Sequence, residues 1–407
     1  MSILFISNAN PHKVNYLTPA EGKIYLVAEP YRFGSVAERS DIIYGPPGEF
    51  SLPEILKQNG REDIEIVIYQ TDPAWSFIPL NLNKVTDKTV VIFGDMHHMA
   101  HPIVKALAYA QRERPYAISS AFTRQHLHWF MAAGFTNFLW EPSFFGSYTQ
   151  TALNSFKNRS EWFTFCGSTS SHPRRAKLLE CLKSNIPDFG KYEVTRQQMG
   201  EIVKNSWLCL NNSLNSDFNM RCFEVIADGG LLVTDRLSRY SGFFDVFTPG
   251  YNCLIYDSPE ELIEIVESRR LLRQVAPVIA ENSHKLYWSQ HEPTMAWGRF
   301  IDAIRKGSFS DYLTLDDRAS SSIEREKWLS VRIAIYEMAQ EIHRNLERVF
   351  VDLSAVALPI VGSDLDDLPR VFPLSVRNEE RDGDAVFFVG MEDEQTAAVY
   401  THRMLLK

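Results

Sequence analysis

The feature that most limits the fold of this chain is the alternation of short apolar strands with amphipathic helices along its first 142 residues. This alternation predicts a parallel β-sheet with helices on both faces. The expected strands are residues 3–7, 23–28, 64–69, 89–93, 116–119 and 137–140. Ligands of such sheets bind beyond the carboxyl ends of the strands, where polar residues stand in this sequence. We therefore expect the first part of the chain to form the rim of a cleft.

A second α/β unit is predicted to begin at residue 161. A strand at 162–166 is followed by a Gly-Ser turn and a helix, and further strands are expected at 207–210, 231–234 and 250–256. A chain of 407 residues exceeds what one hydrophobic core usually supports. We therefore expect an amino-terminal domain at 1–160, a second domain at 161–306 and an extension at 307–407.

Composition and charge exclude several classes of protein. The net charge is −9, of which −7 lies in residues 306–407, with 12 basic and 19 acidic side chains. Nucleic acid is not an expected partner, because duplexes bind to basic faces. Neither a cleavable leader nor a membrane-spanning run is present in the sequence, which predicts a cytoplasmic protein. The five cysteines, odd in number and without a CxxC pair, predict buried reduced thiols.

The stretch between residues 216 and 235, SDFNMRCFEVIADGGLLVTD, predicts half of a nucleotide-binding site. Asn219 and Arg221 open a short helix, where unpaired N–H groups and the positive dipole end favour a phosphate. Glu224, one turn further, can accept hydrogen bonds from both hydroxyls of a ribose. Gly229 and Gly230 can end the helix in a left-handed conformation before a buried strand. An amphipathic helix with a solvated ion pair is the alternative interpretation.

The order of motifs between residues 162 and 305 resembles the carboxyl-terminal half of CgeB-type, spore-maturation-like glycosyltransferases, which are relatives of the group-1 retaining transferases. The motifs are Gly167-Ser168, His172-Pro173-Arg174-Arg175, Arg221 with Phe223-Glu224, Gly229-Gly230 with Thr234-Asp235, and Pro249-Gly250 with residues 256–262. The resemblance implies a GT-B-like α/β architecture, in which two Rossmann-like domains face a cleft. The second domain would bind a nucleotide-sugar donor and the first an acceptor.

The resemblance also implies the residues that bind the donor. Glu224 would bind the ribose, and Arg221 with the turn around Gly167 and Arg175 would bind the diphosphate. The full expected set is Gly167, Ser168, Arg174, Arg175, Asn219, Arg221 and Glu224. Arginine forks and helix dipoles would stabilise the leaving diphosphate in place of a metal. Group-1 transferases often carry a second glutamate eight positions earlier, where this chain has Ser216, so the contact to the donor sugar stays open.

Asp95, His97, His98 and His101 gather behind the predicted strand at 89–93. Three imidazoles and a carboxylate suit zinc, but adjacent residues rarely point at one ion. We expect instead that Asp95, His97 and His98 face the cleft as catalytic residues, acting as hydrogen-bond partners or as a base toward a sugar. A structural role in capping the strand-helix turn is the other alternative.

The extension at 307–407 begins with a polar, serine-rich linker. Apolar residues at spacings of three and four between 328 and 342 predict a helical seam, which packs within the subunit or forms a homo-oligomer through residues 323–349. An expected strand at 385–390 with a helix that runs through Tyr400 predicts that the extension is also α/β.

The leading hypothesis is a metal-independent, retaining glycosyltransferase that uses a nucleoside-diphosphate sugar, needs no other cofactor, and acts on a glycan, a small molecule or a protein. Two other classes stay open. One is a metal-dependent hydrolase that uses the cluster of Asp95, His97, His98 and His101. The other is a non-catalytic GT-B-like interaction protein that uses the acidic extension.

Overall fold

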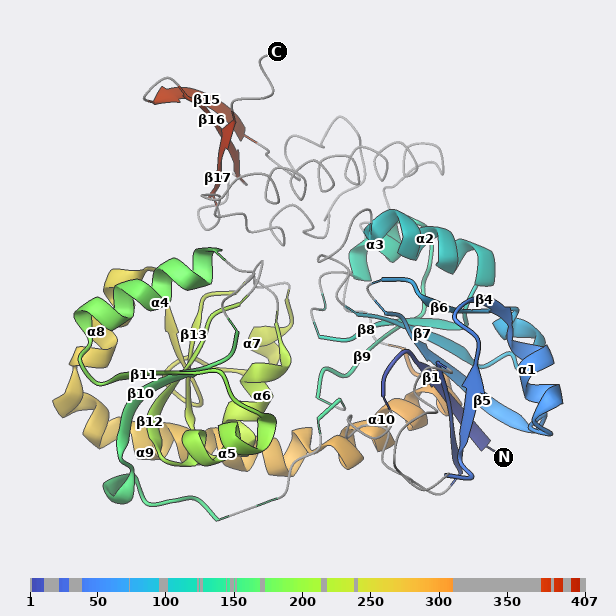
Figure 1. The fold of residues 1–407 in the computed structure, drawn as a ribbon, viewed down its shortest axis with the longest axis horizontal. Helices are drawn as coiled ribbons and strands as arrows, with labels where there is room; N and C mark the ends of the chain where they lie inside the picture. Colours follow the sequence, from blue (N-terminus) through green and yellow to red (C-terminus); the bar gives the residue numbers. More distant parts are fainter. Residues whose placement is uncertain are drawn as a thin grey trace. The chain divides into compact units, whose positions relative to one another are not determined.

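The computed structural model of the chain contains two α/β units and a small carboxyl-terminal sheet (Figure 1). The first unit comprises Met1–Phe145 together with the segment that begins at Ala296, and the second contains Gly146–Met295. The structure describes residues 2–10, 22–28, 39–72, 74–94, 102–122, 124, 127–143, 145–146, 150, 152–168, 173–213, 218–237, 241–309, 375–381, 384–390 and 397–402.

The first unit is built on a sheet whose described strands follow the order β3-β2-β1-β5-β7-β8-β9, with every neighbouring pair parallel. The strands are β1 (Ser2–Ser7), β2 (Lys23–Ala28), β3 (Ile42–Gly45), β5 (Ile64–Gln70), β7 (Thr89–Phe93), β8 (Ala117–Ser120) and β9 (Phe138–Trp140). The predicted strands match six of these within one residue at each end, and only the edge strand β3 was not expected. A separate parallel pair, β4 (Gly48–Ser51) with β6 (Phe77–Leu80), was also not expected. The helices of this part are α1 (Leu52–Gln58), α2 (Pro102–Glu113) and α3 (Leu127–Ala132).

Helix α10 (Pro293–Lys306) completes the core of the first unit. Phe300 and Ile304 are buried in one cluster with residues of β1, β2, β5 and β7. The Arg305 guanidinium donates two hydrogen bonds of 2.8 Å to the carboxylate of Glu65 on β5. The sequence placed this helix in the domain at 161–306, whereas the structure groups it with the first unit. The physical reason is that the apolar partners of its buried face come from the first sheet.

The second unit has a sheet of described strands in the order β11-β10-β12-β13-β14, again parallel throughout. The strands are β10 (Glu161–Cys166), β11 (Phe189–Tyr192), β12 (Ser206–Asn211), β13 (Leu231–Asp235) and β14 (Leu254–Tyr256). The helices are α4 (Pro173–Asn185), α5 (Arg196–Lys204), α6 (Met220–Ala227), α7 (Phe243–Val246), α8 (Pro259–Glu267) and α9 (Arg269–Leu286). Only the edge strand β11 had no counterpart among the predicted strands.

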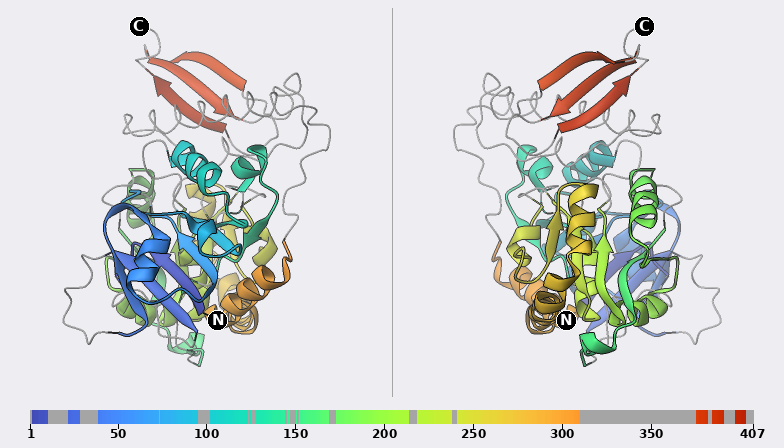
Figure 2. Two further views of the ribbon diagram at one scale, coloured as in Figure 1. Left: turned by 90° about the vertical axis from the view of Figure 1, so that its right-hand side faces the viewer. Right: turned by 90° about the vertical axis from the view of Figure 1, so that its left-hand side faces the viewer.

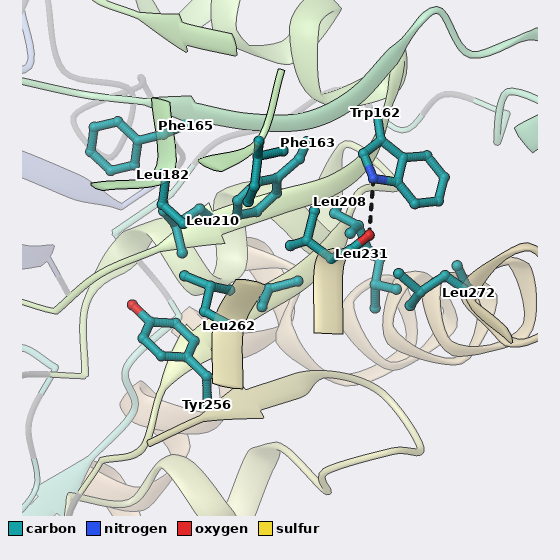
Figure 3. Close-up of a cluster of buried hydrophobic side chains, with 14 of the residues drawn as sticks. Trp162, Phe163, Phe165, Leu182, Leu208, Leu210, Leu231, Tyr256, Leu262 and Leu272 are labelled. Atoms are coloured by element: carbon teal, nitrogen blue, oxygen red, sulfur yellow. Dashed lines mark hydrogen bonds between the residues drawn. The ribbon is translucent and has the colours of Figure 1, made fainter. Parts of the chain in front are cut away.

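Side chains from neighbouring strands form the core of the second unit (Figure 3). Leu208 on β12 and Leu231 on β13 are fully buried, and Leu262 from α8 packs into the same cluster. Trp162 on β10 donates a hydrogen bond of 3.2 Å from its indole Nε1 to the carbonyl oxygen of Val266, drawn as a dashed line in Figure 3. This bond satisfies the polar atom of a buried ring and ties the end of α8 to the sheet.

The turn from α6 into β13 follows the prediction. Gly229 has a φ of 78°, a left-handed conformation that a residue with a Cβ rarely adopts. The N–H of Gly230 donates to the carbonyl of Val225 at 2.9 Å, which closes the end of the helix. The predicted N-cap of α8 is also present, because the Ser258 side chain accepts a hydrogen bond from the Glu261 N–H at 3.2 Å.

The described part of the extension is an antiparallel sheet of β15 (Ser375–Arg381), β16 (Asp384–Gly390) and β17 (Ala397–His402), which lie side by side in Figure 2. The predicted helix through Tyr400 is therefore wrong, because that segment pairs with β16 as a strand. The predicted helical seam and the oligomer contact at 323–349 lie outside the described residues. None of the described helices combines the length and the apolar character needed to cross a lipid bilayer.

Candidate functional site

The amino terminus of α6 lies at the carboxyl end of the second sheet. Asn219 is the N-cap, and its side-chain Oδ1 accepts a hydrogen bond of 3.1 Å from the Arg221 N–H. Met220, the first helical residue, is 36% exposed. The loop 214–217, which contains Ser216, lies outside the described residues. A capped helix start at this edge is a favourable place for an anion, as the sequence predicts.

Arg221 connects this helix start to the neighbouring strand β10. Its guanidinium Nη1 donates to the carbonyl oxygen of Cys166, the last residue of β10. Its Nε lies 2.9 Å from Oε2 of Glu224. The guanidinium therefore already has two protein partners. Its contact to Glu224 is an ion pair, as in the alternative interpretation of this stretch, but the carboxylate is buried and not solvated.

Glu224 is a buried carboxylate, with 9% of the residue exposed. Besides Arg221, its Oε1 lies 3.6 Å from Nε of Arg196, the first residue of α5. Two guanidinium groups thus offset the cost of burying this negative charge. An ionised carboxylate has about four sites at which it can accept hydrogen bonds, so two neighbours do not saturate it.

Gly167 and Ser168 directly follow β10, as predicted. Gly167 has a φ of 155°, and a Cβ placed on it would lie 3.1 Å from the Phe165 ring and 3.8 Å from Nη2 of Arg221. Because Gly167 has no side chain, a ligand can approach the Arg221 guanidinium from this side. A Cβ at this position would crowd the Phe165 ring.

Arg175 on α4 spans the ends of two strands. Its Nη2 donates to the carbonyl of Asn212 at 2.6 Å, just beyond β12, and its Nη1 donates to the carbonyl of Ser168 at 3.3 Å. The guanidinium carbon lies 5.5 Å from the centre of the Phe165 ring. Arg174 is the second residue of α4, and its side chain lies outside the described residues. The structure thus brings Gly167, Ser168 and Arg175 together with the start of α6.

A buried polar network at the same edge was only partly predicted. The Asp235 carboxylate, at the end of β13, accepts hydrogen bonds from the Ser213 N–H at 2.8 Å and from the Ser213 hydroxyl at 2.5 Å. Asn212 donates to the Tyr256 hydroxyl at 3.2 Å, while its own Oδ1 is buried without a hydrogen-bond donor in the described part of the chain. Asn212 and Ser213 were missed. The polar run after the predicted strand at 207–210 could have indicated them, because it stands at the same sheet edge as Asp235.

The sequence predicts that the cysteines are buried reduced thiols. All five are free, and Cys166, Cys209, Cys222 and Cys253 are buried, whereas Cys181 is half-buried. Burial raises the pKa of the Cys166 thiol to about 11, although Arg221 lies nearby and lowers it. Cys166 is therefore a neutral thiol at neutral pH and not an activated nucleophile.

Asp95, His97, His98 and His101 lie outside the described residues. Within the part of the chain that the structure describes, no group of three or more histidine, cysteine, aspartate or glutamate side chains is arranged to bind a metal ion.

A family model described as glycosyl transferase-like matches residues 174–300. This part of the chain is a glycosyltransferase-like domain. It includes Arg175, Arg196, Arg221 and Glu224, while Gly167 and Ser168 precede it. The predicted glycosyltransferase is confirmed at the level of this domain.

Solved structures of similar fold include glycosyltransferases. The complex of Anabaena HepE with UDP-glucose is 10% identical with a TM-score of 0.50, over 75% of this chain and 100% of that chain. Sucrose-phosphate synthase from Thermosynechococcus elongatus is 8% identical with a TM-score of 0.49, over 75% of this chain and 100% of that chain. None of the curated proteins compared with the sequence matches it. The fold of HepE and the two parallel sheets confirm the predicted GT-B-like α/β class, whereas a cleft between the units stays a prediction.

Proposed function

We propose that this protein is a glycosyltransferase of the CgeB-type, group-1 kind, which moves a sugar from a nucleoside-diphosphate donor to an acceptor without a metal and with retention of configuration. The observation that carries the proposal is Glu224, a buried carboxylate between two guanidinium groups, one turn inside the start of α6. The glycosyltransferase-like domain that contains it supports the same activity. No observation on the described residues favours the metal-dependent hydrolase or the non-catalytic interaction protein.

Glu224 is suited to bind the ribose of the donor. Its two oxygens have acceptor capacity beyond Arg196 and Arg221, and two vicinal hydroxyls offer matching donors. The hydrogen bonds would be charge-assisted, which makes them roughly twice as strong as neutral ones. A donor without these hydroxyls would lose these two hydrogen bonds, and that loss gives the site its preference for ribose.

The diphosphate would lie between the backbone at Gly167 and the start of α6. Arg221 presents its Nη2 toward the bare backbone of Gly167, and the first-turn N–H groups after Asn219 carry the positive end of the helix dipole. The Arg221 guanidinium is held by Glu224 and by the carbonyl of Cys166 before a ligand arrives. Such pre-organised positive charge stabilises the leaving diphosphate as the bond to the sugar breaks. Ser168, Arg174 and Arg175 stay proposed contacts of the same group.

The acceptor side of the reaction is assigned to Asp95, His97 and His98. A neutral imidazole or a carboxylate has the chemistry to accept a hydrogen bond, or a proton, from an attacking hydroxyl. This assignment rests on the sequence and stays a proposal.

The test is a thermal-shift panel with UDP, GDP, ADP and dTDP, each with and without EDTA. UDP is the first probe, because HepE, which shares the fold, is solved with UDP-glucose. A ligand at a hundred times its dissociation constant stabilises the folded chain by about 2.7 kcal/mol, which corresponds to roughly 5–10 °C in melting temperature. The variants are Glu224→Gln and, as the matched control, Glu281→Gln at an exposed position on α9.

We expect one nucleotide to raise the melting temperature of the wild type and of Glu281→Gln, irrespective of EDTA, and to have much less effect on Glu224→Gln. The same Glu224→Gln variant should lose transfer of the sugar. A shift of equal size in Glu224→Gln would contradict the ribose assignment. The absence of any shift in the wild type would contradict the proposed donor, and a shift abolished by EDTA would contradict the metal-free mechanism.

A further inference from the structure

The guanidinium of Arg196 contacts two carboxylates at once, those of Glu224 on α6 and of Asp228 at its C-cap, and no motif in the sequence indicates this contact. We propose that Arg196 is a positioning residue that orients Glu224 toward the ribose of the donor. The inference rests on the proposed function, since it concerns the same carboxylate. A positioning role means that replacing Arg196 weakens the binding of nucleotides that carry the ribose hydroxyls and spares those that lack them. A purely structural arginine would not show this difference.

The geometry follows from the placement of α5 beside α6. Arg196 is the first residue of α5, directly after Thr195, whose side chain forms a capping box with Gln198. This fixes the backbone from which the arginine projects. The Arg196 Nη1 lies 2.7 Å from Oδ2 of Asp228, and its Nε lies 3.6 Å from Oε1 of Glu224.

The two acidic partners are four residues apart, with Glu224 inside α6 and Asp228 at its C-cap, so they lie on one side of the helix. One planar guanidinium can reach both because its donors form a rigid fork. A lysine ammonium at this position is a single point charge and cannot reproduce both contacts. The short distance to Asp228 anchors the arginine, and the longer one places its positive charge beside Oε1 of Glu224.

Gly200, one turn along α5 from Arg196, provides the space for this pair. A Cβ on Gly200 would lie 3.2 Å from Nη1 of Arg196 and 3.3 Å from Oδ2 of Asp228, closer than side chains normally pack. Glycine weakens a helix interior relative to alanine, so its presence here has a packing reason. The helix thus leaves room for the contact between Arg196 and Asp228.

The cluster of Arg196, Arg221, Glu224 and Asp228 contains two positive and two negative charges. Arg221 contacts Oε2 of Glu224 and Arg196 lies beside Oε1, so the carboxylate has a cation at each oxygen. Without Arg196, the two carboxylates would face each other in a buried place with one cation fewer. Repulsion from Asp228 would then turn the Glu224 side chain away from its present orientation.

The experiment measures nucleotide affinity by isothermal titration calorimetry on the full chain. The probes are UDP and 2′,3′-dideoxyuridine 5′-diphosphate, which lacks both ribose hydroxyls, or the corresponding pair of the base that the thermal-shift panel selects. The variants are Arg196→Gln, Arg196→Lys, and Arg196→Gln combined with Asp228→Asn, which removes both charges and restores neutrality if the single variant folds poorly. The matched control is Arg269→Gln, because Arg269 also contacts two acidic side chains of the same unit, at 2.8 and 3.7 Å.

We expect Arg196→Gln to weaken UDP binding about tenfold. The double variant should weaken it less, because Asp228→Asn removes the charge that repels Glu224. Both should leave dideoxy-UDP binding within twofold of the wild type. Arg196→Lys should weaken the binding of UDP at least threefold and leave that of dideoxy-UDP unchanged. Arg269→Gln should change neither affinity. In the background of Glu224→Gln, Arg196→Gln should cause no further loss, because the two residues act through one contact.

If Arg196→Gln weakens the binding of UDP and of dideoxy-UDP equally, Arg196 has a merely structural role and the inference is overturned. Unchanged UDP affinity in Arg196→Gln would overturn it as well. If UDP binding falls in Glu224→Gln but not in the Arg196 variants, only this inference fails. If the wild type binds no nucleoside diphosphate, the proposed function fails and this inference with it.

Discussion

Replacing Asp235 with alanine should make the carboxyl ends of β12 and β13 open more often by local unfolding, without the same effect on the first unit. Asp235 accepts two hydrogen bonds from Ser213, at 2.8 Å from the backbone N–H and at 2.5 Å from the hydroxyl, and both residues are buried. A hydrogen bond to a charged acceptor contributes about 1.5–3 kcal/mol. Losing both at the lower value costs about 3 kcal/mol, which corresponds to roughly a hundredfold in a local opening equilibrium.

The assay is native-state hydrogen exchange read by mass spectrometry on peptides that cover β12 and β13. It reports each region separately, which a melting curve of a chain with two units does not. We expect Asp235→Ala to raise the exchange rate of these peptides about a hundredfold. Ser213→Ala, which keeps the backbone hydrogen bond, should raise the rate about tenfold. Peptides from β1 and β5 of the first unit should exchange at the wild-type rate.

The control is Asp257→Ala, because Asp257 has an exposed bidentate contact with Arg236 at 2.6 and 2.9 Å. Exposed ion pairs contribute about 0–1 kcal/mol, so this variant should change the exchange rate less than about fivefold. Equal exchange in Asp235→Ala and Asp257→Ala would refute the reasoning. It would mean that Ser213 finds other partners as soon as the carboxylate is removed.

Two further substitutions test the stability of the protein, one in each unit. Gly229→Ala should lower the free energy of unfolding, measured by urea denaturation, by about 1–3 kcal/mol. The reason is that φ of residue 229 is 78° and that the alanine Cβ would lie 2.2 Å from Cδ2 of Leu153. A variant as stable as the wild type would contradict this account. Lys23→Met tests pH dependence, because burial lowers the pKa of Lys23 to about 8 against 10.5 for the exposed group. The unfolded chain then binds more protons between pH 8 and 10.5, so wild-type stability should rise relative to Lys23→Met across that window. Urea midpoints at pH 7, 9 and 10 measure this, and a constant difference would contradict it.

The predicted strands, among them the edge strands β9 and β14, were predictable because each is a short apolar run. The edge strand β11 was missed for a physical reason, since it pairs on one side only, needs fewer apolar residues and reads Phe-Gly-Lys-Tyr. The missed edge strand β3 reads Ile-Ile-Tyr-Gly, so this reason does not apply to it. The error at Ala397–His402 has a related cause. Its two alanines favour a helix, but Val399, Tyr400 and Thr401 favour a strand once β16 is available for pairing.

From residue spacing alone, the candidate site was predictable only where its residues lie close together in the sequence. Gly167, Ser168 and Arg175 were named through the family resemblance. The helix start at Asn219 and the ribose candidate Glu224 come from one continuous stretch, and so does the turn at Gly229. Arg196 was not predictable, because it meets Glu224 from another helix, 28 positions earlier in the chain. No spacing rule covers such a contact, since it depends on how α5 and α6 pack against the sheet.

The return of α10 to the first unit has a consequence for synthesis of the chain on the ribosome. Gly146–Met295 is a continuous stretch that contains a complete parallel sheet with its helices, so it can fold as soon as it emerges. The first unit, although translated earlier, lacks Phe300 and Ile304 until the end of α10 has been made. An expression fragment that stops at Phe145 would expose the apolar surface that this helix covers. The first unit therefore completes its core only after the stretch Gly146–Met295 has been made.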